Sequence, residues 1–564
     1  MRFALLCVSC FGVASQAAVP SLTHLFPAGG KQGTTFPIVL GGKVAGEGVG
    51  VWVSGAGVTI SAPDAKGNAT ATLAPDAATG LRLVRAFNAE GASAVRWFSV
   101  GVLPEISEKE PNDGIGEGQK IEKQPVCVNG VLDKSGDIDG FTIQVEAGRT
   151  IVAAVEAYAL GSPIDAVLNL FDEQGTRIAT AHDGRNLDPY LAHKVEKTGR
   201  CTIQISGFDH PPRADVRFTG GPTVVYRISI TTEPVVTQFY PAVVPFGVKQ
   251  QVELRGHNLD KIDPAFEVDG AKLAVGETLQ LLQLPKWSIG PMQVLASATV
   301  PLVEKEPNNA ATEAMLVGLP CVAGGTISAA GDVDRFAFQA KKGDRIMVQV
   351  RSKALGMPLD ASLRIESSDG KVLASNDDQG ESPDPMAAFN APAEGTYQAV
   401  VSDLFGKGGA MHGYVVEIGV ERPDIEVSLT SANAIVLAAG KTNELTAKVK
   451  RLGNVTGPLV ACIEGLPPGV LADTVTVDEK KGEVKLTLSA SANAPSSGGP
   501  IVLAVFAKEA KPMTHRTALF ALRGEMKRGT SLLDESDQIW LTVTPGRPEA
   551  ARKSPLPVIG AVPK

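Results

Sequence analysis

An acidic motif that the chain carries twice constrains its fold more than any other feature. The first copy is Glu108-Lys109-Glu110-Pro111-Asn112-Asp113, and the second is Glu304-Lys305-Glu306-Pro307-Asn308-Asn309. Each copy is followed, after a similar interval, by another acidic turn, Gly136-Asp137-Ile138-Asp139-Gly140-Phe141 or Gly331-Asp332-Val333-Asp334-Arg335-Phe336. Motifs that recur in the same order at a similar spacing indicate a duplicated folding unit. The chain is therefore expected to be modular.

Length and composition favour several small β-domains. A chain of 564 residues is too long for one hydrophobic core, and roughly 100–150 residues per domain predicts four or five domains. The 60 Gly and 38 Pro, with few aromatic residues, are typical of short strands joined by tight turns. The formal charge of −8 argues against nucleic acid and anionic membrane surfaces as partners, because both require basic patches.

The first 17 residues are typical of an export signal. Arg2 gives a positive start, residues 3–13 form a short apolar segment, and Ser15-Gln16-Ala17 provides a small-residue cleavage site. A buried N-terminal strand and lipid attachment at Cys10 are the alternatives. No later run of about 18 apolar residues occurs, so no transmembrane span is expected after signal cleavage. These features predict a secreted, periplasmic or cell-surface protein.

Four cysteines remain once residues 1–17 are removed: Cys127, Cys201, Cys321 and Cys462. Export makes disulfides possible, but four scattered cysteines do not form a disulfide framework. Cys127 and Cys201 fall within one unit and are the candidate pair. The alternative is that all four are small buried apolar residues.

Two stretches, residues 18–103 and 233–300, share a pattern of turns and short strands, and we call them A1 and A2. Leu25-Phe26-Pro27 in A1 corresponds to Phe239-Tyr240-Pro241 in A2, and each is followed by a glycine and an alternating strand. These stretches resemble the immunoglobulin-like fold of the plexin and transcription-factor (IPT/TIG) type. The resemblance implies a β-sandwich for each stretch.

Residues 104–232 and 301–421 contain the acidic motifs, and we call them B1 and B2. Leu160-Gly161-Ser162-Pro163-Ile164-Asp165 in B1 corresponds to Leu355-Gly356-Met357-Pro358-Leu359-Asp360 in B2. Phe141-Thr142-Ile143-Gln144-Val145 alternates apolar and polar residues, which predicts a half-buried strand of an antiparallel sheet. Asp165 and Asp360 are interpreted as structural turn residues.

Both B stretches carry three motifs in one order: Glu-x-Glu-Pro-Asn, Gly-Asp-x-Asp-x-Phe and Leu-Gly-x-Pro-x-Asp. In this respect B1 and B2 resemble the bacterial pre-peptidase C-terminal (PPC) domain, a small jelly-roll β-sandwich found beside secreted proteases and in large exported proteins. The alternation of A and B stretches further resembles exported proteins of planctomycetes and Verrucomicrobia. Both resemblances imply export.

The remaining residues complete the expected architecture. Residues 422–545, called C, contain the alternating segment 443–450 and resemble an immunoglobulin-like domain of the kind appended to glycosidases. The tail, 546–564, is rich in Pro, Arg and Lys and is expected to be disordered. The fold class predicted for the whole chain is all-β, as tandem antiparallel β-sandwiches.

The acidic motifs have the residue types of a calcium site. Calcium takes six to eight oxygens at about 2.3–2.6 Å, from carboxylates, amides and carbonyls. Residues i and i+2 of an extended segment point to one side, so Glu108 and Glu110 face one way, and Asp137 and Asp139 do the same from another turn. So many carboxylates close together would repel each other without a cation.

The family resemblance implies the same chemistry, because collagen-binding members use the Glu-x-Glu-x-Asn-Asp segment and downstream aspartates as calcium ligands. The resemblance nominates Glu108, Glu110, Asn112, Asp113, Asp137 and Asp139 in the first copy, and Glu304, Glu306, Asn308, Asn309, Asp332 and Asp334 in the second. Asn309 replaces an Asp, so weaker binding is expected at the second site. The alternative is that both motifs are solvated turns.

No catalytic motif is present. The sequence has no His-Glu-x-x-His zinc site, no Gly-x-Ser-x-Gly elbow and no cysteine pair with zinc-finger spacing. Trp52, Trp97, Trp287 and Trp540 lie in separate stretches, and each is interpreted as a core anchor. We therefore expect an exported protein that is not an enzyme, in which calcium stiffens the A–B junctions. It would act in binding extracellular protein or polysaccharide, or as a spacer. The alternatives are an accessory or targeting component of a secreted peptidase, and a hydrolase with an unrecognised site.

Overall fold

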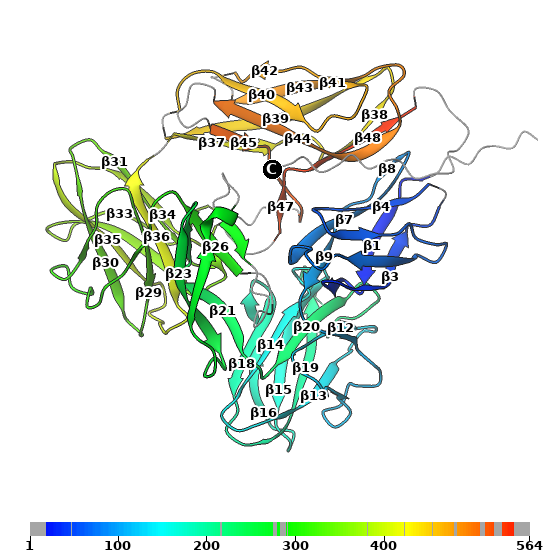
Figure 1. Cartoon of the computed structure of the whole chain (residues 1–564), viewed down its shortest axis with the longest axis horizontal. Helices are drawn as coiled ribbons and strands as arrows, with labels where there is room; N and C mark the ends of the chain where they lie inside the picture. The colour runs from blue at the N-terminus through cyan, green and yellow to red at the C-terminus, as the bar shows by residue number, and fades with distance from the viewer. Residues whose placement is uncertain are drawn as a thin grey trace, which may run out of the picture.

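The computed structural model describes residues 18–46, 48–214, 217–273, 279–282, 289, 292–380, 382–421, 423–453, 455–478, 482–507, 514–523 and 533–545. The expected export signal at 1–17, the expected disordered tail at 546–564 and Trp287 lie outside these residues. Within them the chain forms strands and two 3₁₀ helices, η1 (Gly270–Lys272) and η2 (Lys353–Leu355). The strands gather into separate sandwiches (Figure 1), which confirms the predicted all-β fold class. No helix of the described part is long and apolar enough to cross a membrane.

A1 is a sandwich of two sheets, and alternate residues line its interior. In β5, for example, Val58 and Ile60 are buried and Thr59 between them is exposed. One sheet has the order β1 (Ser21–Phe26), β3 (Thr35–Lys43), β6 (Asn68–Leu73), β5 (Val58–Ile60). The other has the order β2 (Gly29–Lys31), β9 (Arg96–Gly101), β7 (Gly80–Asn88), β4 (Gly50–Val53), with β8 (Gly91–Ala92) on β7.

A2 repeats the start of A1 in a smaller form. Its sheets have the orders β21 (Val235–Tyr240), β23 (Lys249–His257), β24 (Ala265–Asp269) and β22 (Val243–Pro245), β26 (Met292–Ser297), β25 (Leu279–Leu282). Strand β21 pairs antiparallel with β23 as β1 pairs with β3, and β22 runs parallel to β26 as β2 runs parallel to β9. This pairing places Tyr240 of A2 where A1 has Phe26.

B1 is a larger sandwich whose two sheets exchange consecutive strands. One sheet has the order β10 (Glu105–Ser107), β12 (Val126–Val131), β20 (Val225–Thr231), β14 (Thr150–Glu156), β18 (Asp188–Lys194), β17 (Asp183–Arg185). The other has the order β11 (Gln119–Lys120), β13 (Asp139–Val145), β19 (Gly199–Asp209), β15 (Ile164–Phe171), β16 (Arg177–Ala181). Because β12 and β13 belong to different sheets, the turn between them crosses the end of the sandwich.

B2 has the same strand order as B1. Its sheets run β27 (Leu302–Val303), β29 (Cys321–Thr326), β36 (Gly413–Val420), β31 (Arg345–Arg351), β34 (Met386–Asn390) and β28 (Met315–Leu316), β30 (Val333–Ala340), β35 (Gly395–Asp403), β32 (Ala361–Ser367), β33 (Val372–Asn376). The order matches strand by strand as far as β18 and β16 of B1. The two acidic motifs therefore lie on equivalent loops.

C is a sandwich of two sheets with a short separate ribbon. One sheet has the order β37 (Asp424–Leu429), β39 (Thr442–Leu452), β43 (Glu483–Ala490), β41 (Val470–Ala472). The other has the order β38 (Ala434–Ala438), β48 (Ile539–Thr544), β44 (Ser497–Ala507), β40 (Leu459–Glu464), β42 (Val475–Thr476), with β45 (Thr514–Thr517) on β44. A separate two-stranded ribbon pairs β46 (Phe520–Ala521) with β47 (Glu535–Ser536).

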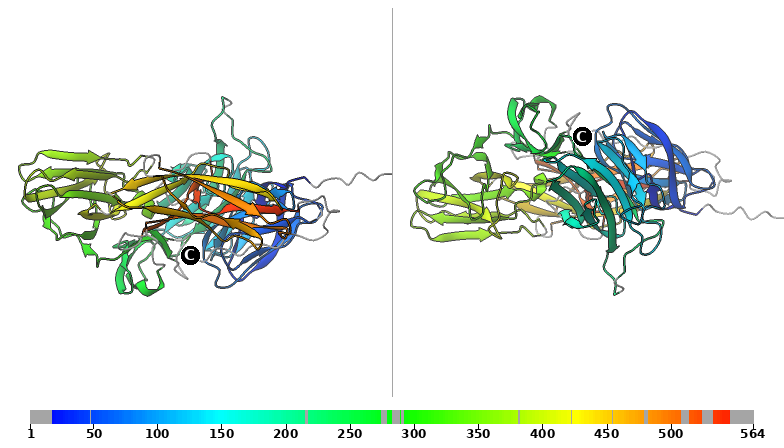
Figure 2. Two further views of the ribbon diagram at one scale, coloured as in Figure 1. Left: turned by 90° about the horizontal axis from the view of Figure 1, so that it is seen from above. Right: turned by 90° about the horizontal axis from the view of Figure 1, so that it is seen from below.

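Each of the five sandwiches has its own buried apolar core, and a further cluster joins three of them. This cluster brings Trp52, Phe87 and Trp97 of A1 together with Leu160 of B1 and Trp540 of C. Seen from above, C spans from B2 to A1 (Figure 2). The three tryptophans within the described part therefore join modules. The interpretation of each as a core anchor is confirmed for these three, and the core that they anchor is shared between modules.

Arg523 of C reaches the junction between A1 and B1. Its guanidinium lies over the ring of Trp97 at 4.0 Å and over that of Tyr158 at 5.0 Å, and it forms an ion pair with Asp534 at 3.0 Å. It also donates to the carbonyl oxygens of Tyr158 and Ala159. The indole nitrogen of Trp97 donates to the carbonyl oxygen of Leu533 at 2.9 Å, so the contact is held from both sides.

The two ends of the described chain both contact the same part of A1. Asn88 Nδ2 donates to the carbonyl oxygen of Ala18 at 2.8 Å, and the adjacent Phe87 packs on Trp540 with ring centroids 5.2 Å apart. The chain path A1–B1–A2–B2–C therefore closes on itself.

The Leu-Gly turn of each B module packs on the A module before it. Leu160 belongs to the cluster that includes Trp97, and a side chain at Gly161 would clash with that ring. In B2, Leu355 and Met357 pack with apolar residues of A2. The Leu-Gly motif that both copies share thus makes an equivalent contact between B1 and A1 and between B2 and A2.

A buried aspartate holds each of these turns. Asp188 accepts hydrogen bonds from the backbone N–H groups of residues 157–159 at 2.7–2.8 Å, and Asp384 accepts from residues 352–354 at 2.8–2.9 Å. Both carboxylates are almost fully buried. Each side chain satisfies three backbone donors that the turn would otherwise leave unpaired.

Cys127 and Cys201 do not form the candidate disulfide, since all four described cysteines are free thiols. Cys127 lies in β12 between Val126 and Val128, which both face the B1 core, so its own side chain points to the opposite face. Cys201 lies in the other sheet and faces the core. Burial raises the pKa of the Cys127 thiol to about 12.

We expect Arg523→Ala to weaken the contact between C and the A1–B1 junction by about 2 kcal/mol, because a partly desolvated cation–π contact is lost with its hydrogen bonds. Small-angle X-ray scattering should show a larger radius of gyration. The control is Arg516→Ala, which removes an exposed ion pair with Asp424 within C. An unchanged scattering profile for Arg523→Ala would contradict the closed arrangement.

Candidate metal centres

The topology of the B modules brings their two acidic segments together. Residues 108–118 connect β10 in one sheet to β11 in the other, and residues 132–138 connect β12 to β13 across the same end. Strand β10 pairs parallel with β12, and β11 pairs parallel with β13, so both connections leave the sandwich at one place. Residues 304–314 and 327–332 do the same in B2.

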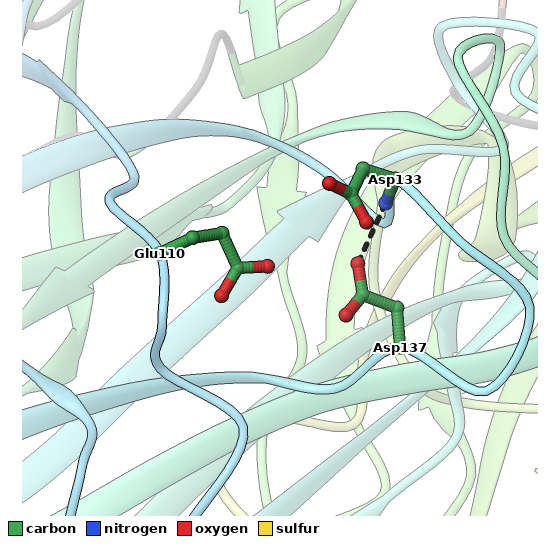
Figure 3. A group of neighbouring side chains, drawn as sticks. All are labelled: Glu110, Asp133 and Asp137. Atoms are coloured by element: carbon green, nitrogen blue, oxygen red, sulfur yellow. Dashed lines mark hydrogen bonds between the residues drawn. The ribbon is translucent and has the colours of Figure 1, made fainter.

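The outer part of the first site consists of three carboxylates that converge (Figure 3). Glu110, Asp133 and Asp137 each offer a carboxylate oxygen, and these oxygens lie within 4.8 Å of one another. Asp137 is fully buried and accepts from the backbone N–H of Asp133 at 2.6 Å. Asp113 lies at the exposed rim. Asp133 was not among the residues nominated from sequence.

A lysine amine lies among these carboxylates. Lys134 Nζ is 3.3 Å from Asp137 Oδ1, 3.9 Å from Asp133 and Asp113, and 4.0 Å from Glu110. The hydrogen bond to Asp137 and the charge of that carboxylate raise the pKa of Lys134. The side chain is 59% exposed, so its amine is held by charge and not by packing.

The inner part of the first site is a pair of opposed carboxylates. Glu108 Oε1 accepts from the backbone N–H of Val131 at 3.0 Å, and Asp139 Oδ2 accepts from the Tyr226 hydroxyl at 2.6 Å. No donor among the described residues reaches the other oxygens, Glu108 Oε2 and Asp139 Oδ1. Burial, and then the adjacent Glu108, raises the pKa of Asp139 to about 9. Burial also raises the pKa of Glu108.

The second site repeats this arrangement. Glu304, Glu306 and Asp334 offer oxygens within 4.8 Å of one another. Asp334 Oδ2 accepts from the Tyr414 hydroxyl at 2.6 Å, as Asp139 does from Tyr226. Burial, and then the charge of Asp334, raises the pKa of Glu304 to about 9, and burial raises the pKa of Asp334 to about 6.

A glycine makes room for each tyrosine. Gly130 lies opposite Tyr226 across β12 and β20, and Gly325 lies opposite Tyr414 across β29 and β36. A Cβ at either glycine would come within 2.1–2.3 Å of the tyrosine ring. The sequence alone did not identify these pairs, although a Gly and a Tyr at matching positions of both repeats were a signal that could have been used.

The remaining nominated residues have different positions. Asn112 and Asn308 are fully buried, and within the described residues Asn112 Nδ2 and both polar side-chain atoms of Asn308 have no hydrogen-bond partner. Asp332 accepts from the backbone N–H and the hydroxyl of Ser328, and Asn309 accepts from the backbone N–H of Val333. Asn309 is exposed and lies at the rim.

These residues fit a hard divalent cation. Oxygens that bind one calcium ion at about 2.3–2.6 Å lie at most about 5 Å apart, and both oxygen groups satisfy this limit. The buried carboxylate oxygens without donors and the unpaired Asn308 Oδ1 are groups that a bound cation would satisfy. Opposed buried carboxylates otherwise have to share a proton. Calcium itself stays a proposal.

Comparison with known proteins bears on B2. Residues 332–403 match the family model of the bacterial pre-peptidase C-terminal domain. The PPC match begins at Asp332 and spans β30 to β35, so it follows the acidic loop 304–309. This match and the all-β fold fit a non-catalytic extracellular module. The resemblance of B1 to the PPC domain, and that of A1 and A2 to IPT/TIG domains, stay predictions.

Solved structures also resemble parts of the chain. The pre-peptidase C-terminal domain of a collagenase from Bacillus anthracis is 18% identical, covers 20% of this chain and 99% of its own, and has a TM-score of 0.17. PliG of Aeromonas hydrophila, a periplasmic inhibitor of g-type lysozyme, is 13% identical, covers 23% of this chain and 96% of its own, and has a TM-score of 0.15. No curated protein matches the chain.

We expect Tyr414→Phe to lower the free energy of unfolding of B2 by about 1–3 kcal/mol in chelator, because it leaves a buried carboxylate with one donor fewer. Tyr397→Phe is the matched control. Tyr397 is buried in the same module, and its hydroxyl donates to the neutral carbonyl oxygen of Ala393 at 2.7 Å. Its loss should cost about 1 kcal/mol. Denaturant unfolding measures both, and equal losses would contradict a special role for Tyr414.

Proposed function

We propose that this chain is an exported, non-catalytic protein of tandem β-sandwiches in which calcium, bound at the acidic end of each B module, fixes the module against its neighbours. The observation that carries the proposal is the pair of opposed carboxylates in each B module, Glu108 with Asp139 and Glu304 with Asp334. Glu108 Oε2, Asp139 Oδ1 and Asp334 Oδ1 are buried and lack a donor in the described chain. Folding would hold these like charges together at a cost that a divalent cation offsets.

The proposed ligands are the residues that carry these oxygens and their neighbours. In B1 they are Glu108, Glu110, Asn112, Asp113, Asp133, Asp137 and Asp139, and in B2 they are Glu304, Glu306, Asn308, Asn309, Asp332 and Asp334. The B2 set has fewer carboxylates, because Asn309 and Ser328 stand where B1 has Asp113 and Asp133. This difference supports weaker intrinsic binding at the second site.

The second site is coupled to the preceding module. Tyr240 of A2 donates its hydroxyl hydrogen to Glu304 Oε1 at 3.2 Å, and its ring lies 3.7 Å from the Arg255 guanidinium. Arg255 in turn donates to the Thr326 hydroxyl of B2 at 3.0 Å. A metal that orders Glu304 would therefore order the A2–B2 junction. A1 has Phe26 at the equivalent position, which cannot donate.

The closed chain path favours a binding role over a spacer role, because a spacer holds its two ends apart. The partner is proposed to be an extracellular protein or polysaccharide. The PPC match favours a second role, as an accessory component of a secreted peptidase. Calcium-dependent co-sedimentation of the purified chain with collagen fibrils or an insoluble polysaccharide would favour the first role.

Calorimetric titration of the purified chain with calcium should show two sites, and thermal unfolding should move to higher temperature as calcium increases. A ligand at about 100 times its Kd stabilises the folded state by about 2.7 kcal/mol. Glu110→Gln and Glu306→Gln should each remove one site.

The controls for this titration are Glu117→Gln and Glu313→Gln, exposed residues at equivalent positions of the two acidic loops. Both should retain two sites. If the chain takes up no heat, and unfolding is the same in calcium and in chelator, the acidic motifs are turns and the proposal is wrong.

Tyr240→Phe should weaken calcium binding at the second site on the order of tenfold, since removing a group that orients a metal ligand typically costs that much. The first site serves as the internal control in the same titration and should keep its affinity. An equal change at both sites, or at neither, would show that the A2 module does not support the second site.

A further inference from the structure

The two acidic sites share the geometry of one turn, in which the first site has a lysine where the second has an alanine. Asp137 N donates to the carbonyl oxygen of Lys134 at 3.1 Å, and Asp332 N donates to that of Ala329 at 3.2 Å. The Asp133 and Ser328 N–H groups donate to the carboxylates of Asp137 and Asp332 at 2.6 and 2.7 Å. The preceding glycines, Gly136 and Gly331, share a φ of +86° and +80°. Lys134 and Ala329 therefore occupy the same place.

Lys134 supplies a positive charge where the first site would hold a cation. Its amine lies within 4.0 Å of four carboxylates, including Asp137 and Glu110, two of the three that converge there. A calcium ion at about 2.3–2.6 Å from the same oxygens would come close to the amine. Two cations so close repel each other, so the amine and the metal compete for one position.

Among the described residues, no such amine lies at the second site, where Ala329 takes the place of Lys134. Ala329 and Ala330 line an open depression of about 540 Å³ together with Glu306, Asn309 and Asp332. Glu306 and Asp332 of the second site thus line a space that a cation can enter directly. At the first site the same entrance is taken by a side chain that is 59% exposed and can swing into water.

Buried oxygens behind the outer carboxylates show that the first site is built for a cation. Asp139 is fully buried, and its Oδ1 lacks a donor in the described part of the chain. Glu108 Oε2 is likewise buried without a donor, and the charges of Glu108 and Asp137 both act on Asp139. Lys134 satisfies the outer carboxylates but leaves these inner groups as they are.

We propose that Lys134 is a tethered competitor of the metal: its amine occupies the first site when calcium is low and leaves when calcium binds. This inference rests on the proposed calcium binding. It makes the first site weaker than its carboxylates alone would make it, whereas the second site, with Ala329, binds without displacing a charge. The two copies would then fill at different calcium concentrations, in an order set by Lys134 as well as by the number of carboxylates.

Lys134→Met removes the charge and keeps the length of the side chain, and should raise the calcium affinity of the first site on the order of tenfold. The titration is done in the full chain carrying Glu306→Gln, so that the first site alone is measured. The control is Lys109→Met, an exposed lysine of the same acidic loop, which should leave the affinity unchanged.

The reciprocal exchange tests the second site. Ala329→Lys in the chain carrying Glu110→Gln should lower the calcium affinity of the second site by a similar factor, and Ala329→Met should not. A fold-independent readout is acetylation of Lys134, followed by mass spectrometry. The paired amine should react slowly in chelator and faster in calcium, while Lys109 reacts equally in both.

The outcomes separate the two proposals. Calcium binding that Lys134→Met leaves unchanged, or an acetylation rate of Lys134 that ignores calcium, overturns the competitor role and leaves calcium binding intact. No calcium binding in the unsubstituted chain or in any variant overturns both. Stronger binding in Lys134→Met together with weaker binding in Ala329→Lys supports the competitor role.

Discussion

The structure depends on pairs of carboxylates that folding holds face to face. Glu108 meets Asp139, and Glu304 meets Asp334, at one end of a sandwich, where the aspartates are fully buried and the glutamates partly buried. Like charges in such a place need a proton or a cation between them. One tyrosine hydroxyl satisfies one oxygen of each aspartate, and the glycine opposite that tyrosine gives the ring its space. The acidic end of each B module is therefore supported by residues of the sheet itself, namely the tyrosine and the glycine opposite it.

The sequence predicted the local features well, because they depend on residues close together in the chain. Alternation gave the strands, and the repeated acidic motifs gave two sites whose segments the topology does bring together. Asp133 and Lys134 were missed because only the turn's geometry shows that they face Glu110. The Cys127–Cys201 disulfide was wrong because strand alternation places the two thiols on different faces. Trp52 and Trp540 pack on each other although three sandwiches separate them along the chain, and no local sequence pattern reports such a contact.

Duplication has kept the acidic end and changed what it contacts. At the A1–B1 junction, buried Arg227 of B1 pairs with Glu105 at 2.9 Å and with Glu156 at 3.2 Å, and Glu156 accepts from the Ser99 hydroxyl of A1 at 3.1 Å. The A2–B2 junction has Val415 in place of that arginine and relies on Tyr240 and Arg255, which A1 replaces with Phe26 and Gly41. Within the described part of the chain, only the second junction has a hydrogen bond from an A module to a candidate ligand, that of Tyr240 to Glu304. The copies share a fold, but their junctions respond to different groups.

The closed chain path has a mechanical consequence. When a chain of sandwiches is linear, tension applied at its ends passes through every module in series. Here Ala18 and Trp540 contact the adjacent residues Asn88 and Phe87 of A1. Tension at the two ends therefore first loads the aromatic packing of Trp540 on Trp52 and Phe87. The three other sandwiches, B1, A2 and B2, which carry both acidic sites, stay outside the loaded path until that contact ruptures. The contact therefore breaks before any module unfolds. The chain then lengthens by the distance that the folded B1, A2 and B2 span between A1 and C.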